Sequence, residues 1–260
     1  MKFDFSDSNV VVTGSSRGIG FAVAEAFCAA NANVTLIAET DEVFSACEQL
    51  SAHPGSKVNG IKCDISDPDQ VRRTFAALDR IDVLVNNAGL ELITPILATA
   101  DDGDKIEQDF KRIIDINVMG TFYVSRNAVA KMPSGSSIII TCSIWSRTAV
   151  AEFSAYCASK HATLGFMRSM SKELAPAGIR VNGVCPGWVR TEASMRSLHA
   201  ICERTGQSEE EVLNEILGAQ SLEGLMEPAD VADTYLFLSS DAAKNITGQA
   251  VNVDRGEVMS

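Results

Sequence analysis

The chain has 260 residues, of which 46% are hydrophobic and 22% are charged. This length and composition suit one large α/β domain with a sizeable core, and they exclude an intrinsically disordered chain. The formal net charge is −12 and Lys and Arg form no run, which argues against a nucleic acid or an anionic membrane surface as partner.

Neither the N-terminus nor the cysteines indicate secretion. Acidic residues occur within the first seven positions, which is not typical of a signal peptide, and no apolar run reaches the length of a membrane span. The seven cysteines are scattered and lack C-x-x-C spacing, which favours buried thiols in a reducing compartment over a zinc site. We therefore expect a cytoplasmic protein that binds no metal.

Short β-branched runs alternate with helical patterns along the chain. Strands are predicted at 9–14, 33–38, 57–64, 81–89, 136–143, 179–186 and 249–254. Helices are predicted at 18–30, 41–52, 67–78 (with Ser66 or Asp67 as N-cap), 104–132, 154–175 and 228–240. Several strands are continuously apolar, as in a parallel sheet that is covered on both faces. The alternation predicts a single doubly wound, Rossmann-type α/β domain over 1–260 with a parallel seven-stranded sheet.

One segment interrupts this alternation in the C-terminal third. Residues 190–226 are partly helical and acidic, and they are too long for a plain connection between a strand and a helix. Two interpretations stay open: a substrate-binding insert, since long loops often carry function, or a solvated helical excursion.

A glycine-rich turn follows the first predicted strand and precedes a helix. The stretch is Thr13–Gly20, TGSSRGIG. Glycine permits a tight turn and a close backbone approach, and a helix N-terminus offers free N–H groups and a positive dipole end to a pyrophosphate. We therefore predict a dinucleotide site, with a purely structural turn as the alternative. The predicted contacts are Gly14, Ser16, Arg17, Gly18, Ile19 and Gly20.

The choice between NAD and NADP rests on two opposed signals. Glu39 ends the second strand, where a carboxylate would hold the adenosine ribose hydroxyls and repel a 2′-phosphate. Arg17 lies in the glycine turn, where a guanidinium would pair with that phosphate. We predict NAD, with NADP left possible.

Tyr156 and Lys160 lie four residues apart in the helical pattern at 154–175. Residues at i and i+4 share one helix face, so the ammonium group can lie close to the phenol. A free tyrosine has a pKa of about 10, and a nearby positive charge lowers it toward that of a useful base. The alternative is an ordinary pair of neighbours on a helix.

Together these features resemble the short-chain dehydrogenase/reductase family over essentially the whole chain. The resemblance rests on the glycine turn, on NNAG (Asn86–Gly89) after the fourth strand and on Tyr156-x-x-x-Lys160. It extends to Asp64, Asn117, Ser143 and PGWVRT (Pro186–Thr191).

The resemblance implies a role for each matching position. Ser143, Tyr156 and Lys160 would be catalytic, with the serine thirteen residues before the tyrosine, and Asn117 would support a proton relay. Contacts to the cofactor would come from Asp64, Ile65, Asn87, Ala88, Gly89, Tyr156, Lys160, Pro186, Gly187, Val189 and Thr191. The resemblance also implies a homo-oligomer, commonly a tetramer.

Three positions depart from the family pattern. Ala38 stands where NAD-preferring members often have Asp, and Glu39 stands where NADP-preferring members often have Arg. Arg255 follows Asp254 where the family often has glycine, which would alter the local turn or a subunit contact.

The substrate pocket of the family is built from loops that here contain Glu91, Leu92, Trp145, Arg147 and Trp188. Ser143 and Tyr156 would hold the reacting oxygen. The tryptophans would stack on a sugar or ring, and Arg147 would pair with an anionic group, unless it points to solvent. These residues favour a polar hydroxylated substrate, such as a sugar or hydroxy acid.

Three functions therefore remain open. The first is NAD-dependent oxidation of a secondary alcohol, and the second is NADPH-dependent carbonyl reduction of the 3-oxoacyl type. The third is a dinucleotide sensor without catalysis, against which the four catalytic positions argue because a sensor needs no proton relay.

Overall fold

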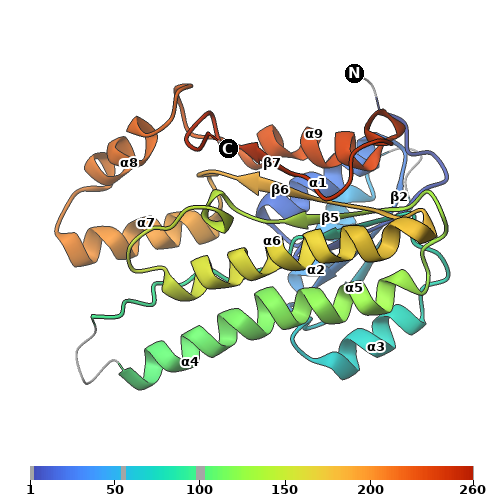
Figure 1. Ribbon diagram of the computed structural model, residues 1–260, viewed down its shortest axis with the longest axis horizontal. Coiled ribbons are helices and arrows are strands. Elements are labelled where there is room, and N and C mark those ends of the chain that lie inside the picture. Colours follow the sequence, from blue (N-terminus) through green and yellow to red (C-terminus); the bar gives the residue numbers. More distant parts are fainter. Residues whose placement is uncertain (1–2, 54–56, 98–102, 260) are drawn as a thin grey trace.

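The computed structural model describes residues 3–53, 57–97 and 103–259, and within them seven parallel strands form one sheet (Figure 1). The strand order is β3-β2-β1-β4-β5-β6-β7, so the direction of winding reverses between β1 and β4. Ligands of such sheets bind beyond the carboxyl ends of the strands at this switch point. The strands are β1 (Asn9–Thr13), β2 (Asn33–Ala38), β3 (Val58–Lys62), β4 (Val83–Asn86), β5 (Ser137–Thr141), β6 (Arg180–Pro186) and β7 (Ala250–Val253).

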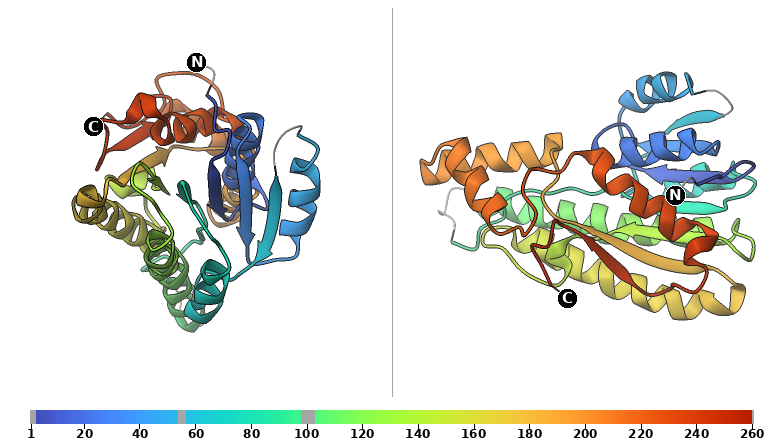
Figure 2. Two further views of the ribbon diagram at one scale, coloured as in Figure 1. Left: turned by 90° about the vertical axis from the view of Figure 1, so that its right-hand side faces the viewer. Right: turned by 90° about the horizontal axis from the view of Figure 1, so that it is seen from above.

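Helices cover both faces of the sheet (Figure 2). One face carries α1 (Gly18–Ala29), α2 (Glu42–Leu50) and α9 (Pro228–Ser239). The other carries α3 (Pro68–Ala76), α4 (Gly103–Ile114), α5 (Thr121–Val129) and α6 (Ser154–Leu174). This arrangement confirms the predicted doubly wound α/β fold.

Successive side chains of each strand enter opposite layers. Val10 and Val12 of β1 pack into the core beneath α1 and α9, whereas Val11 packs into the core beneath α3, α5 and α6. All three are at most 2% exposed. A strand buried on both faces needs apolar residues at every position, which is why these runs are continuous rather than alternating.

The helix predicted over 104–132 is interrupted by a wider turn. α4 continues through a π-helical segment, η2 (Asp115–Gly120), into α5. The Thr121 hydroxyl donates to the Asn117 carbonyl oxygen at 2.7 Å. A contact with a distant segment of the same chain also shapes this turn. A Cβ on Gly120 would lie 2.7 Å from Cδ1 of Ile65. Such π-turns often occur at functional sites, and this one contains Asn117.

The segment 190–226 folds into two helices at the carboxyl end of the sheet (Figure 1). They are α7 (Glu192–Thr205) and α8 (Glu209–Gly218). An isolated bridge between Val189 and Met226 joins the two ends of the segment. Arg255 adopts φ 54°, and its carbonyl oxygen accepts hydrogen bonds from Ser221 N and Leu222 N, both at 2.9 Å. The departure at Arg255 therefore coincides with a left-handed turn that holds the C-terminal segment to this insert.

Asp67, rather than Ser66, caps α3. Its carboxylate accepts hydrogen bonds from the N–H groups of Asp69 (2.8 Å) and Gln70 (3.1 Å). The pKa of Asp67 is held below its usual range mainly by a hydrogen bond from the Gln70 side-chain amide (2.9 Å) and then by the one from the Gln70 N–H. Among the described helices, none is both long and apolar enough to cross a membrane.

Replacing Arg180 by methionine is expected to lower the free energy of unfolding by about 1–3 kcal/mol, because it leaves partly buried carbonyl groups without this donor. The guanidinium donates to the carbonyl oxygens of Leu238 (2.6 Å), Ser239 (3.1 Å) and Ser240 (3.3 Å) at the C-terminal end of α9. Urea denaturation followed by circular dichroism measures the change. Arg72→Ala is the control. Among the described residues Arg72 makes an exposed ion pair with Asp69, and its loss should change stability by less than about 0.5 kcal/mol. Equal effects of the two variants would contradict the expectation.

Candidate active site

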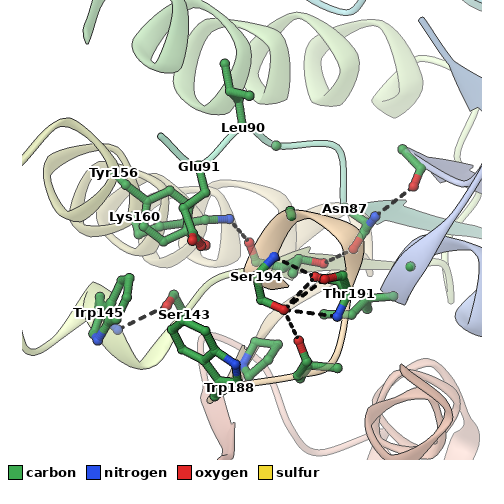
Figure 3. A pocket seen from close by; sticks show the side chains of 18 of the residues that line it. Asn87, Leu90, Glu91, Ser143, Trp145, Tyr156, Lys160, Trp188, Thr191 and Ser194 are labelled. Carbon is green, nitrogen blue, oxygen red and sulfur yellow. Dashed lines mark hydrogen bonds between the residues drawn. The ribbon is translucent and has the colours of Figure 1, made fainter. Parts of the chain in front are cut away.

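A cavity of about 760 Å³ extends along the carboxyl ends of the strands. At one end it is lined by Glu39 and Asp64, and at the other by Tyr156 and Trp188. Its size is within the range of cofactor and small-molecule sites. The cavity gathers most of the residues that the sequence predicts for a cofactor and a substrate, and Figure 3 shows the end that contains the titratable groups.

The glycine turn forms one wall of this cavity. Gly14 has φ +64°, and a Cβ on it would lie 2.6 Å from Cα of Ala88. A Cβ on Gly20 would lie 2.2 Å from the Gly14 carbonyl oxygen. Arg17 is the N-cap of α1 but makes no capping hydrogen bond with its side chain, and the first turn contains no acidic residue. The α1 N-terminus therefore fits the pyrophosphate of a dinucleotide.

The loop after β4 is tied to this turn by hydrogen bonds. Thr13 Oγ1 accepts from the backbone N–H groups of Asn87 and Ala88, both at 3.1 Å. Asn87 Nδ2 donates to the carbonyl oxygens of Thr13 (3.2 Å) and Gly14 (3.1 Å). These bonds place Asn87, Ala88 and Gly89 along the wall of the cavity.

Polar groups at the adenosine end already have protein partners. Asp64 accepts hydrogen bonds from the N–H (2.8 Å) and hydroxyl (2.7 Å) of Ser66. Arg17 makes ion pairs with Glu42 (2.5 Å) and Glu192 (3.2 Å). Glu39, Asp64 and Ile65 line the cavity, with Glu39 exposed.

The loop after β6 closes the opposite wall. Pro186, Gly187, Val189 and Thr191 line the cavity, and a Cβ on Gly187 would lie 2.8 Å from the Cβ of Asp254. The Thr191 hydroxyl caps α7 by accepting from Ser194 N at 3.1 Å. The first helix of segment 190–226 therefore begins at the wall of the cavity.

Ser143, Tyr156 and Lys160 meet at the substrate end (Figure 3). Ser143 caps a short 3-10 turn after β5, η3 (Ile144–Ser146), with its Oγ accepting from Trp145 N at 3.1 Å. Tyr156 and Lys160 project from one face of α6, with Lys160 Nζ 5.5 Å from the centre of the Tyr156 ring. A serine, a tyrosine and a buried lysine therefore share one cavity with the glycine turn.

Burial alters the pKa values of the pair. The pKa of Tyr156 is raised well above its usual range by burial and by the negative charge of Glu91, against a hydrogen bond with Ser143. The pKa of Lys160 is lowered, mainly by burial. Burial and the charge of Glu91 therefore dominate the pKa of Tyr156 in the protein chain alone. The ammonium group donates instead to the carbonyl oxygen of Thr141 at 2.7 Å.

Known proteins of this architecture resemble the chain over its whole length. A family model described as enoyl-(acyl carrier protein) reductase matches residues 14–257. D-beta-hydroxybutyrate dehydrogenase of Rhizobium meliloti (strain 1021) is 31% identical over 255 residues, which are 95% of this chain and 96% of that protein.

Solved structures resemble it equally broadly. L-sorbose reductase from Gluconobacter frateurii, complexed with NADPH and L-sorbose, has a TM-score of 0.88 and 26% identity, and the match covers 100% of both chains. A 3-oxoacyl-[acyl-carrier protein] reductase with bound NAD from Brucella melitensis has a TM-score of 0.82 and 30% identity, covering 98% of this chain and 92% of its own.

The chain belongs to the short-chain dehydrogenase/reductase family. It is an oxidoreductase that acts on CH–OH groups with NAD(P). When bound, the nicotinamide of NAD(P) accepts or supplies the hydride.

The protein's own groups in this dehydrogenase/reductase can manage the accompanying proton. Tyr156 is placed to accept the hydroxyl proton of an alcohol, or to return it to a carbonyl oxygen. Ser143 can hold that oxygen by a hydrogen bond. Lys160 places a positive charge beside the phenol, which favours phenolate when proton removal is required.

Asn117 braces the site through its side chain. Its Oδ1 accepts from Leu90 N at 2.7 Å, and its Nδ2 donates to Leu90 O (3.0 Å) and Ser159 Oγ (2.9 Å). These bonds connect η2, the loop after NNAG and α6. The visible role of Asn117 in this dehydrogenase/reductase is therefore to position neighbouring segments.

Three residues were predicted to contact the substrate without a catalytic role: Trp145, Arg147 and Trp188. Two of them line the cavity. Trp145 packs edge-on against Tyr156, with ring centres 5.9 Å apart, and Trp188 is 8% exposed. Arg147 does not line it. Its guanidinium donates to Asn252 Oδ1 (3.1 Å) and Ala250 O (2.8 Å), so β7 draws it away from the cavity. Pairing of Arg147 with an anionic substrate is therefore not supported.

Reasoning from the sequence assigned no chemistry to Glu91, although it placed this residue in a pocket loop. It also missed Ser197 on α7, whose hydroxyl donates to Glu91 Oε1 at 2.6 Å. These residues are 106 positions apart, and no motif joins them. The only sequence signal was a carboxylate directly after NNAG-Leu90.

Proposed function

We propose that the protein transfers hydride between NAD and a secondary alcohol or its ketone, with a polar hydroxylated compound as substrate. The observation that supports this best is the grouping of Ser143, Tyr156 and Lys160 in the cavity that begins at the glycine turn. Asn117 serves as the brace of this centre and as part of its proton relay. A sensor without catalysis would not require this grouping.

The proposal for NAD rests on charges at the adenosine end. Glu39 offers a carboxylate to ribose hydroxyls and opposes a 2′-phosphate. Arg17 is held between Glu42 and Glu192, so its charge is already balanced. Solved relatives contain either nucleotide, since the Brucella reductase has bound NAD and the sorbose reductase is complexed with NADPH.

The proposal for the substrate rests on the far end of the cavity. Trp145 and Trp188 provide apolar faces beside Tyr156, and α7 and α8 supply further lining residues. We assign residues 190–226 as the substrate insert of a single domain. The protein is also proposed to be cytoplasmic and to form a homotetramer, whose mass in solution light scattering measures.

The wild-type protein is expected to bind NAD at least about tenfold more tightly than NADP, because the acidic adenosine end repels the extra phosphate. Calorimetric titration with each nucleotide measures this. Turnover is then followed by absorbance of the reduced nucleotide with neutral and acidic hydroxylated compounds and, in reverse, with 3-oxoacyl thioesters. Activity confined to NADPH and 3-oxoacyl thioesters would favour the second candidate function.

Glu39→Gln with Glu42→Gln is the matched variant for the same titration. It removes one repelling carboxylate and one of the two partners of Arg17. The ratio of NADP to NAD affinity should rise in it, while Glu223→Gln, outside the cavity lining, should leave the ratio unchanged. An unchanged ratio of NADP to NAD affinity in the double variant would show that neither residue determines which nucleotide binds.

A further inference from the structure

Glu91 lies at the substrate end of the cavity, on a segment that the protein holds firmly. The residue before it, Leu90, makes hydrogen bonds to Asn117 through both its N–H (2.7 Å) and its carbonyl oxygen (3.0 Å). Figure 3 shows the Glu91 side chain directed toward Tyr156 and Lys160. Its carboxylate is thus part of the reacting end of the cavity and not of the outer rim.

Contacts from α7 fix the position of this carboxylate. Ser197, 3% exposed, donates to Glu91 Oε1 at 2.6 Å, and Arg196 Nη2 donates to the Glu91 backbone carbonyl oxygen at 3.3 Å. The described part of the chain donates no hydrogen bond to Oε2. One oxygen is therefore positioned by the insert while the other remains available as an acceptor.

The charges around Glu91 agree with its direction toward Tyr156 and Lys160 in Figure 3. Burial raises its pKa, whereas the Ser197 hydrogen bond and the positive charges of Arg196 and Lys160 lower it. In turn, its negative charge raises the pKa of Tyr156. The other titratable groups that act on Tyr156 are Cys157 and Cys142.

The lining of this end matches hydroxyl groups better than carboxylates. A second carboxylate beside Glu91 would be repelled in a partly dehydrated site, where like charges interact strongly. A hydroxyl group can donate a hydrogen bond to the Glu91 carboxylate, whereas a carboxylate on the substrate can only accept.

We propose that Glu91 is a specificity-determining residue that accepts a hydrogen bond from a hydroxyl of a neutral, polyhydroxylated substrate and excludes carboxylate-bearing analogues. This assignment rests on the proposed function, because it takes the cavity beside Tyr156 as the substrate site. It narrows the substrate class to polyols and neutral sugars and removes hydroxy acids. The substrate needs no ammonium group to balance the charge of Glu91, because the positive charges of Lys160 and Arg196 already act on this carboxylate.

The test uses three probes that differ at one terminal group: glucitol, gluconate and glucamine. Their affinities for the nucleotide-loaded protein are measured at equilibrium by ligand-observed NMR, which does not depend on turnover. The wild-type protein should bind glucitol at least about tenfold more tightly than gluconate. Glu91→Gln retains an acceptor for Ser197 and removes the charge, so this ratio should collapse toward unity.

Glu209→Gln is the control, because it makes the same charge change on α8 outside the cavity lining. It should leave the wild-type ratio intact. A second readout is the pH profile of oxidation, which should move to lower pH in Glu91→Gln as the Tyr156 phenol loses a neighbouring negative charge.

Four outcomes would overturn the assignment of Glu91: gluconate binding the wild type as tightly as glucitol, an unchanged ratio in Glu91→Gln, tightest binding of glucamine, or binding of none of the probes. Failure of the proposed function looks different. It would appear as no oxidation of any alcohol with either nucleotide, whatever the three probes show in the binding measurement.

Discussion

Replacement of Tyr156 by phenylalanine is expected to reduce turnover by about 10²–10⁴-fold while nucleotide affinity changes little. The substitution removes only the phenolic oxygen, which is the group placed to exchange a proton with the substrate. The ring remains, and with it the edge contact to Trp145 at 5.9 Å between centres. Steady-state kinetics and calorimetric titration with NAD measure the two quantities separately.

The control for this variant is Tyr123→Phe. Tyr123 lies on α5 and does not line the cavity, so loss of its hydroxyl should leave turnover within about twofold of wild type. If Tyr156→Phe retained most of its turnover, Tyr156 would not be the acid–base group and the proposed function would fail.

The same phenol determines the direction of the pH dependence. Burial raises the pKa of Tyr156, so the neutral phenol predominates at neutral pH. Alcohol oxidation needs the deprotonated form as a base, and its rate should therefore rise with pH. Carbonyl reduction uses the neutral phenol as an acid and should not show this rise.

Gly20→Ala is expected to lower the free energy of unfolding by about 1–3 kcal/mol and nucleotide affinity by at least about tenfold. The added methyl would lie 2.2 Å from the Gly14 carbonyl oxygen and 2.5 Å from Asn87 Nδ2. The turn must open to admit it, which displaces the walls on both sides of the predicted pyrophosphate site. Urea denaturation and calorimetric titration with NAD measure the two effects.

Gly165→Ala is the matched control on α6. Apart from its own helix backbone and chain neighbours, no atom of the described residues lies within 4 Å of a Cβ on Gly165, so the substitution meets open space. Alanine is favoured over glycine inside a helix by about 0.5–1 kcal/mol, so stability should rise and nucleotide affinity should stay unchanged. Equal losses in the two variants would show that close packing at Gly20 is not the cause.

The central strands were predictable because they are buried on two faces. The middle positions of β1, β4 and β5 are all apolar, and such runs are visible without knowledge of their partners. The predicted ends of the strands were less accurate. The strand predicted over 81–89 is β4, which spans only Val83–Asn86. The last residues of that prediction turn toward Thr13, a contact between segments 74 positions apart.

The interruption at Asn117 could not be predicted from helical periodicity. Residues 104–132 have a continuous helical pattern, and the π-turn depends on contacts that come from elsewhere in the chain. Asn117 bonds to Leu90 and Ser159, while Gly120 packs against Ile65. These contacts are long-range, so no local window contains them.

The sequence by itself determined the doubly wound fold, the glycine turn and the pair on α6, because each depends on local spacing or on burial of a whole segment. Only the tertiary structure decided where long side chains point. Arg147 lies two residues from Trp145 but turns to β7, and Glu91 meets Ser197 from the insert. The direction of a polar side chain depends on which distant partner satisfies its hydrogen bonds, and that partner exists only once the chain has folded.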